Sequence, residues 1–192
     1  MGNIESVYEL RDVTKYIIGS PCEVMGAGFP YAKIIPHMLT NSGTSYDLDK
    51  LCHDYVEYYR TEAATPSACV AITHTAELEA LASAMKRVNA AGIKDDFSLS
   101  NVQYYEGLSA HSFYDLEDMV QQSCADETAA SEFKRQLEKT VTSRYHTDRF
   151  YTAYGGGTHY HDIKYYGGIS TSAMVDHYYA DWKITAWYIA TH

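Results

Sequence analysis

Two histidines and an aspartate near residue 160 are the first candidates for chemistry in this sequence. His159, His161 and Asp162 stand together in the run HYHD. On a β-strand, residues i and i+2 point to the same side, so the two imidazoles could bind one metal ion. The spacing selects no third ligand among the other candidates, His111, His146 and His177. An exposed loop beside the glycines at 155–157 explains the same run without a metal, and we assign no metal ligand.

A cysteine and a histidine form a second candidate, as nucleophile and general base of a hydrolase. Cys22 follows a short apolar run, and catalytic groups collect at strand ends in parallel sheets. His37 follows in the chain, but a thiol nucleophile needs its base within hydrogen-bond distance. Cys52 and Cys69 lie in apolar patterns and are expected to be small buried side chains. No cysteines have zinc-site spacing, and no glycine run matches a phosphate-binding loop.

The composition describes a globular chain and disfavours several classes of partner. The 192 residues are 46% hydrophobic and 21% charged, which is ordinary for a folded domain. Because no run of about 18 apolar residues occurs, we expect no membrane span. The net charge of −10 disfavours nucleic acid and favours neutral or cationic partners. Tyrosine occurs 19 times against 5 phenylalanines, so an exposed aromatic surface would be able to stack on sugars.

The first half of the chain alternates helices with short apolar runs. Helices are expected near residues 3–15, 31–40, 48–59 and 75–92, and strands at 16–20 and 68–72. The strongest helical pattern has apolar residues at i, i+3, i+4, i+7, i+8 and i+11: Leu48, Leu51, Cys52, Tyr55, Val56 and Tyr59. A capping-box-like start precedes this helix at 44–47, and Thr75 is expected to cap the next one. The order strand, helix, helix, strand, helix predicts parallel α/β packing.

The second half has a different pattern. A short strand is expected at 102–105, followed by helices near 113–122 and 127–145. Two tyrosine-rich runs, 149–154 and 163–166, are separated by glycines and suggest a β-hairpin with a long connection. A terminal helix is expected over 173–190, with Val175, Tyr178, Tyr179, Trp182, Ala186 and Ile189 facing inward.

Several runs together resemble the clostripain family of cysteine peptidases. They are Met1-Gly2-x-Ile4-Glu5-x-Val7-Tyr8-x-Leu10, Tyr16-Ile17-Ile18-x-Ser20-Pro21-x-Glu23 and Gly28-Phe29-Pro30-Tyr31. The similarity continues through the helix at 78–85, through Tyr166-Gly167-Gly168-Ile169-Ser170-Thr171, and through Ala186-Trp187-Tyr188. The runs occur in order over nearly the whole chain, and the first thirty residues are the most specific.

The resemblance implies a fold and a domain organisation. The family has the caspase-like fold of the clan that includes gingipains and legumain. We therefore expect an α/β fold: a caspase-like parallel-sheet sandwich that lacks its N-terminal strands, with an α+β C-terminal subdomain. Residues 1–75 would be the downstream part of the catalytic domain, and 76–192 the family-specific subdomain.

The resemblance also implies cleavage after Arg or Lys by a thiol paired with a histidine. In the family the nucleophile stands in an Asp-x-Cys-x segment directly before the Met-Gly that is Met1-Gly2 here, and the histidine lies further upstream. We assign no catalytic residue to this chain, which is expected to be inactive alone and to pair with an upstream half. Secretion or a bacterial cell-envelope location is implied, no cofactor is required, and calcium is an open alternative.

The loop after the first strand would form a wall of the pocket that receives Arg or Lys. A cationic side chain in a partly desolvated pocket needs a carboxylate partner. Glu23 is the acid that we assign to this role, with Ser20, Met25 and Phe29 as wall residues. Ala27 stands where a second acid was expected, and a solvated loop acid explains Glu23 equally well.

A hypothesis from another class is a stand-alone binding module. Its surface would be the tyrosine-rich region with His159 and His161, and its ligand a glycan or a metal ion. The peptidase hypothesis predicts instead that the isolated chain exposes a strand edge and aggregates.

Overall fold

The computed structural model describes residues 2–39, 47–154, 159–173 and 179–192. The helices are α1 (Ile4–Glu9), α2 (Tyr31–Met38), α3 (Leu48–Thr61), η1 (Thr75–Glu77), α4 (Leu78–Ala91), η2 (Leu99–Asn101), α5 (Leu116–Ser123), α6 (Glu127–Thr140), α7 (Tyr179–Lys183) and α8 (Ala186–Thr191). The strands are β1 (Tyr16–Gly19), β2 (Cys69–His74), β3 (Phe113–Asp115), β4 (Val141–His146), β5 (Arg149–Tyr151), β6 (Tyr160–Asp162) and β7 (Ser170–Ser172).

Three of these strands form a central sheet in the order β1-β2-β4. β1 pairs with β2 in the antiparallel direction, with Tyr16 opposite His74 and Gly19 opposite Ala71. β4 pairs antiparallel with the other edge of β2. The two apolar runs are strands, as expected, but the parallel arrangement predicted for them is wrong. An apolar run shows that both faces of a strand are covered and says nothing about its direction.

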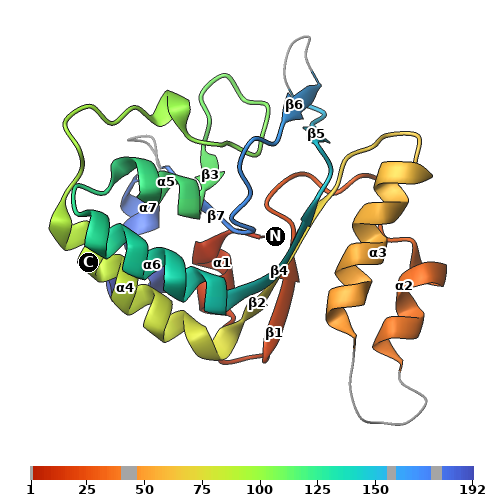
Figure 1. The fold of residues 1–192 in the computed structure, drawn as a ribbon, viewed down its shortest axis with the longest axis horizontal. Coiled ribbons are helices and arrows are strands. Elements are labelled where there is room, and N and C mark those ends of the chain that lie inside the picture. Colours follow the sequence, from red (N-terminus) through yellow and green to blue (C-terminus); the bar gives the residue numbers. More distant parts are fainter. Residues whose placement is uncertain (1, 40–46, 155–158, 174–178) are drawn as a thin grey trace.

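Helices cover both faces of this sheet, which gives three layers (Figure 1). Successive residues of β1 serve opposite faces: Ile17 packs against one apolar cluster and Ile18 against the other. In β2, Ala71 belongs to the first cluster, and Val70 and Ile72 belong to the second. This alternation within continuous apolar runs is what a sheet buried on both faces requires.

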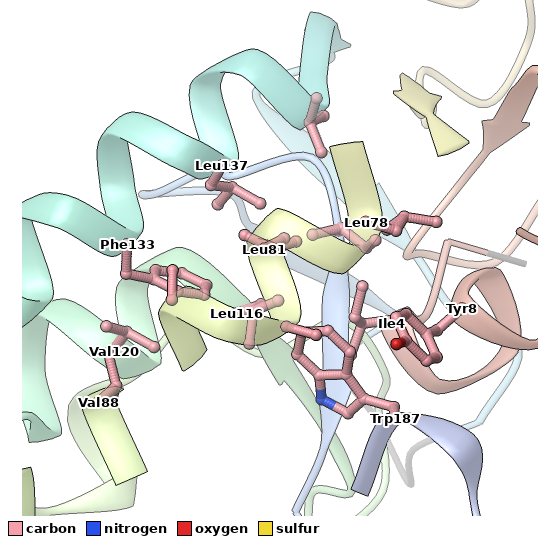
Figure 2. Packing of buried hydrophobic residues seen from close by; sticks show 14 of the residues in the cluster. Ile4, Tyr8, Leu78, Leu81, Val88, Leu116, Val120, Phe133, Leu137 and Trp187 are labelled. Carbon is pink, nitrogen blue, oxygen red and sulfur yellow. The ribbon is translucent and has the colours of Figure 1, made fainter. Parts of the chain in front are cut away.

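The first cluster is built by α1, α4, α5, α6 and α8 (Figure 2). Leu81, Phe133 and Leu137 have no exposed surface. The Trp187 ring meets the Tyr8 ring edge to face at 5.4 Å, which fastens α8 to α1. The helix expected at 75–92 is confirmed as α4, which ends at Ala91 with Gly92 as its C-cap. Thr75 does not cap it, because its hydroxyl donates to the Thr14 carbonyl instead.

The second cluster lies under α2 and α3. The predicted stripe of α3 is confirmed: Leu51, Cys52, Tyr55, Val56 and Tyr59 are buried. The side chain of Asp47 caps the helix by accepting from the Lys50 amide at 2.9 Å. The expected capping segment at 44–46 lies outside the described residues.

Two predicted helices are shorter than their apolar patterns. α1 ends at Glu9, and Leu10 and Val13, which were expected on its apolar side, are 47% and 77% exposed. α6 ends at Thr140, where β4 begins with Val141. The run from Val141 to His146 contains β-branched and aromatic residues and pairs with β2. Tertiary pairing with a central strand therefore overrides the helical pattern there.

The remaining strands form two small antiparallel pairs. β3 pairs with β7, and β5 pairs with β6. The expected hairpin is present, but its second strand is Tyr160–Asp162 rather than the 163–166 run. The run at 102–105 contributes a single bridge, from Tyr104 to Tyr114. The terminal helix is two helices in the described part, α7 and α8, and Thr185 caps the second of them.

Both the sheet and the first cluster contain residues from before and from after position 75. β4 follows that residue in sequence yet pairs with β2, and α1 packs with α8. The boundary between a catalytic part and a C-terminal subdomain stays a prediction. Within the described ranges, no helix has the length and apolar character needed to cross a bilayer.

Candidate substrate-binding site

The chain enters the fold beside the end of β1. The Gly2 amide donates to the Ser20 carbonyl at 2.8 Å, and the Gly2 carbonyl accepts from the Ser170 amide at 2.7 Å. A Cβ on residue 2 would lie 2.7 Å from the Pro21 nitrogen and 2.8 Å from the Ser20 carbonyl carbon. Glycine is therefore required at this position, and it holds the start of the chain against the loop of residues 20–30.

A disulfide joins this loop to the central strand. Cys22 is bonded to Cys69, the first residue of β2. The Ser20 hydroxyl donates to the Cys22 carbonyl at 2.8 Å, which closes the turn around Pro21. The suggestion that Cys22 is a nucleophile is wrong, because its sulfur is already bonded. Cys69 is buried as expected, but as half of a disulfide rather than as a free thiol.

His37, the base suggested for Cys22, lies in a separate charged cluster between α2 and α3. Its Nε2 is 2.8 Å from Asp54 Oδ2, and His53 Nδ1 is 3.0 Å from Asp54 Oδ1. Hydrogen bonds from His53, Lys50 and His37, opposed by partial burial, hold the pKa of Asp54 at about 2. This cluster links two helices, and its hydrogen bonds join α2 to α3.

Glu23, the acid assigned to the pocket, is exposed and follows Cys22 directly. Its Oε2 accepts a 3.0 Å hydrogen bond from the Ala153 amide, in the connection after β5. The bond joins segments 130 residues apart in sequence. Glu23 therefore anchors the β5–β6 hairpin to the loop, and its other carboxylate oxygen accepts no hydrogen bond from the described residues.

The wall residues Met25 and Phe29 pack under α3 rather than pointing freely into solvent. Both contact the second apolar cluster, and the Phe29 ring lies 4.5 Å from the ring of Tyr55. The Tyr59 hydroxyl donates to the Gly28 carbonyl at 2.7 Å and holds this end of the loop. Between these anchors Val24, Gly26 and Ala27 are exposed. The exposed part of the loop thus carries no acid besides Glu23.

The Tyr166-Gly167-Gly168 run, noted above as part of a resemblance, packs closely against the sheet and Asp115. The Gly167 amide donates to Asp115 Oδ2 at 2.7 Å. Gly168 has φ +87°, and a Cβ there would lie 2.9 Å from Ala71 Cβ and from Val141 Cγ1. The run places the Ser170 amide where it donates to the Gly2 carbonyl, so it helps to hold the first residues of the chain in place.

Asp115 is the buried acid behind this run, and reading the sequence missed it. It has no exposed surface and accepts from the Tyr105 hydroxyl at 2.7 Å, the Gly167 amide and the Asp118 amide. Burial raises the pKa of Asp115 to about 6, although these hydrogen bonds oppose the rise. A usable signal was the Asp115-x-x-Asp118 spacing before an apolar helix, which is typical of a helix cap.

We expect a pH dependence of stability from Asp115. Its folded-state pKa lies above the usual value for an unfolded aspartate, about 4, so the folded state binds the proton more tightly. Its stabilising contribution is full below pH 4 and is lost as the pH rises through 6. Relative to Asp115→Asn, the free energy of unfolding of the unmodified chain should fall by about 2 kcal/mol between pH 4 and 7.

Urea unfolding of both proteins across this pH range measures that difference. The charge of Glu117 contributes to the raised pKa of Asp115, so the measured difference includes the interaction between these two carboxyl groups. A difference that stays constant with pH would contradict the prediction.

The candidate metal ligands do not converge. The His161 ring stacks on Phe150, and its Nδ1 is 3.2 Å from the Tyr104 hydroxyl. His159 stacks on Tyr151, and its Nδ1 is 3.1 Å from the Thr152 carbonyl oxygen. His111 pairs with Glu106, His146 contacts Tyr166, and His177 lies outside the described residues. In the part of the chain described, no three His, Cys, Asp or Glu side chains are grouped to hold a metal ion.

The three-layer fold matches that of the caspase-like cysteine peptidases, a class that includes the solved structures described below. The chain belongs to the clostripain family, whose profile matches residues 1–186. No curated protein sequence matches the chain.

Solved structures of bacterial cysteine proteases superpose on the whole chain. One is a clostripain from Bacteroides thetaiotaomicron, at 34% identity and a TM-score of 0.90, with 83% of that chain covered. Another is a secreted cysteine protease of the same organism, iotapain, at 35% identity and a TM-score of 0.90, with 53% covered. A Bacteroides fragilis cysteine protease gives 26% identity and a TM-score of 0.86, with 82% covered. The chain therefore spans about half of one relative and about four fifths of two others.

Proposed function

We propose that this chain is the downstream part of a cysteine endopeptidase that cleaves after Arg or Lys. Its catalytic cysteine and histidine would come from an upstream segment. The observation that carries the proposal is the position of Gly2, which is held between Ser20 and Ser170 at the start of the loop. A residue placed just before Met1 would therefore emerge beside the segment that carries Glu23.

The sheet offers a place for the rest of such an enzyme. Within the described residues, β1 pairs with β2 along one edge and has no partner along the other. Tyr16 and the nearby Val13 are exposed beside this edge. An unpaired strand edge with exposed apolar side chains is a surface that another strand would cover. The upstream half is the partner that we propose for it.

The acidity of the chain and the inhibitor bound to one solved relative support a basic substrate. The chain carries a net charge of −10, and Glu23 retains a carboxylate oxygen for a cation. The B. thetaiotaomicron clostripain was solved with a peptide inhibitor, BTN-VLTK-AOMK, whose peptide letters end in lysine. We assign Glu23 to recognition of the cation, and Ser20, Met25 and Phe29 to the shape of the loop around it.

The test joins this chain to an upstream segment that carries the family's Asp-x-Cys and histidine. The joined protein should cleave peptide amides after Arg and Lys, while this chain alone should not. Replacing the upstream cysteine with alanine is the control for cleavage by a contaminant. A folded joined protein that cleaves neither substrate would contradict the proposal.

The substitution Glu23→Gln separates recognition from anchoring. Glutamine keeps an oxygen that accepts from the Ala153 amide but removes the charge. In the joined peptidase we expect KM for Arg and Lys substrates to rise about tenfold, as for loss of one charge-assisted hydrogen bond, with Tm unchanged. Glu23→Ala should lower Tm as well. Unchanged kinetics in Glu23→Gln would remove Glu23 from the substrate site.

We also propose that the protein is exported from a bacterial cell. Disulfides persist in oxidising compartments, and Cys22 is bonded to Cys69. Two relatives are described as secreted. If the protein is unfolded without a reductant and then alkylated, two of its four cysteines should be labelled, Cys52 and Cys124. Labelling of all four would contradict the disulfide.

A further inference from the structure

The loop of residues 20–30 is held at both ends and exposed in the middle. At its start the Ser20 carbonyl accepts a hydrogen bond from the Gly2 amide, and the disulfide joins Cys22 to Cys69 in β2. At its end Gly28 accepts from the Tyr59 hydroxyl. The residues between them lie outside helices and strands, and Glu23, Val24, Gly26 and Ala27 are exposed. The geometry of Glu23 therefore depends on the anchors beside it.

The disulfide is the anchor that connects Glu23 to the rigid part of the molecule. Cys69 has no exposed surface and begins the central strand, which is paired on both edges. Cys22, whose Cα is 6.4 Å from that of Cys69, is the residue directly before Glu23. The hydrogen bond from Ala153 to Glu23 is the other tie, but it comes from an exposed connection. A covalent bond to a central strand constrains Glu23 more tightly than a single exposed hydrogen bond does.

The surroundings of the disulfide protect it from reductants. Cys22 is 5% exposed, and Tyr105, Phe150 and Ile163 pack in the same cluster. The free cysteines, Cys52 and Cys124, are buried in the other two clusters. Thiol–disulfide exchange requires direct attack on a sulfur atom, so the loop must open before a reductant can act.

We propose that the Cys22–Cys69 disulfide is a positioning element for substrate, because it fixes the loop that presents Glu23. The proposal rests on the proposed function, since it takes the loop to face a basic substrate. The intact bond would hold the loop ready for binding. Once reduced, the loop would sample many arrangements, which would weaken substrate binding with little effect on the chemical step.

The first experiment does not depend on peptidase activity. A glutamate-specific endoproteinase is applied to the folded chain and to Cys22→Ala/Cys69→Ala, and cleavage after Glu23 is compared with cleavage after Glu127. Both glutamates are exposed, and Glu127 lies in the first turn of α6. Global unfolding accelerates both cleavages equally, whereas local release of the loop accelerates only the first. The ratio is expected to rise at least tenfold, and an unchanged ratio would overturn the proposal.

If the double variant does not fold, reduction of the native protein serves the same purpose. Dithiothreitol supplies two electrons and two protons, the Cys22–Cys69 bond becomes two thiols, and the reductant leaves as its cyclic disulfide. The thiols are blocked with iodoacetamide, and the same cleavage ratio is measured. The control for loss of a cysteine elsewhere is Cys124→Ser, measured without reduction. Serine keeps a donor for the Asp126 carbonyl, and the Cys22–Cys69 disulfide stays intact.

The second experiment measures kinetics in the joined peptidase. In Cys22→Ala/Cys69→Ala we expect KM for an Arg peptide amide to rise at least tenfold, with kcat within threefold. Prolonged treatment of the unmodified enzyme with dithiothreitol at high concentration, which reduces the Cys22–Cys69 bond, should likewise raise KM. An unchanged KM would overturn the proposal. A raised cleavage ratio without peptidase activity in any protein would instead overturn the proposed function and leave the loop restraint supported.

Discussion

Replacing Cys22 and Cys69 together with alanine is expected to lower the free energy of unfolding by about 4 kcal/mol. The disulfide spans a sequence separation of 47 residues, and a cross-link of that length removes about this much chain entropy from the unfolded state. The closed segment contains α2 and α3. Without the bond, the second apolar cluster and hydrogen bonds such as those from the Ser143 and Tyr145 hydroxyls to Asp49 must hold both helices against the sheet. Urea unfolding at neutral pH, followed by circular dichroism, measures the change.

The matched control removes two buried sulfur atoms without breaking a cross-link. Cys52 and Cys124 are both buried and free, so Cys52→Ala/Cys124→Ala leaves two small cavities of the same kind. Because the cavity effect is shared, the two double variants should differ by about 3 to 4 kcal/mol. If both variants lose equal stability, the cross-link contributes nothing beyond packing. The unmodified chain, reduced and alkylated, should behave like the Cys22/Cys69 variant.

The substitution Gly168→Ala is expected to destabilise the fold by about 3 kcal/mol. Its φ of +87° disfavours any residue with a Cβ, at a cost of about 1 to 2 kcal/mol. The new methyl group would also lie 2.9 Å from Ala71 Cβ and Val141 Cγ1, in the two paired strands β2 and β4. Overpacking of a close-packed site costs a further 1 to 3 kcal/mol. Thermal or urea unfolding of the variant measures the sum.

Gly28 provides the control for this effect. It also has a positive φ, +68°, but a Cβ there meets nothing within 4 Å. The free energy of unfolding of Gly28→Ala should therefore fall only by the cost of the positive φ, about 1 kcal/mol. Equal losses at the two positions would show that the contact with Ala71 and Val141 does not matter. In the joined peptidase, Gly168→Ala should also lower activity, because the 166–170 run holds Ser170 against Gly2.

The local elements of this fold were largely predictable from the sequence. The α3 stripe from Leu51 to Tyr59 and the apolar runs of β1 and β2 are all present. Such patterns are readable because side chains repeat every 3.6 residues in a helix and alternate in a strand. The β1 run and other short runs, from Met1 to Tyr31 and from Tyr166 to Thr171 among them, carried the resemblance to the clostripain family, which the family profile and the solved structures confirm.

The candidate site was predictable only as a segment of chain. The resemblance pointed to the loop after β1, and the structure holds that loop against Gly2. It did not predict that Glu23 bonds to the Ala153 amide or that Asp115 holds the Gly167 amide. These partners lie 130 and 52 residues apart in sequence, and no local pattern relates them. Whether Glu23 binds a basic side chain stays a prediction.

The sequence by itself determined most of the buried and helical stretches and the family to which the chain belongs. Only the tertiary structure decided that β1 and β2 run antiparallel, that α6 ends where β4 begins, and that Cys22 and Cys69 are bonded. The physical reason is that local periodicity reflects the geometry of a single segment. Strand direction, cysteine pairing and buried hydrogen bonds depend instead on which distant surfaces meet when the chain collapses.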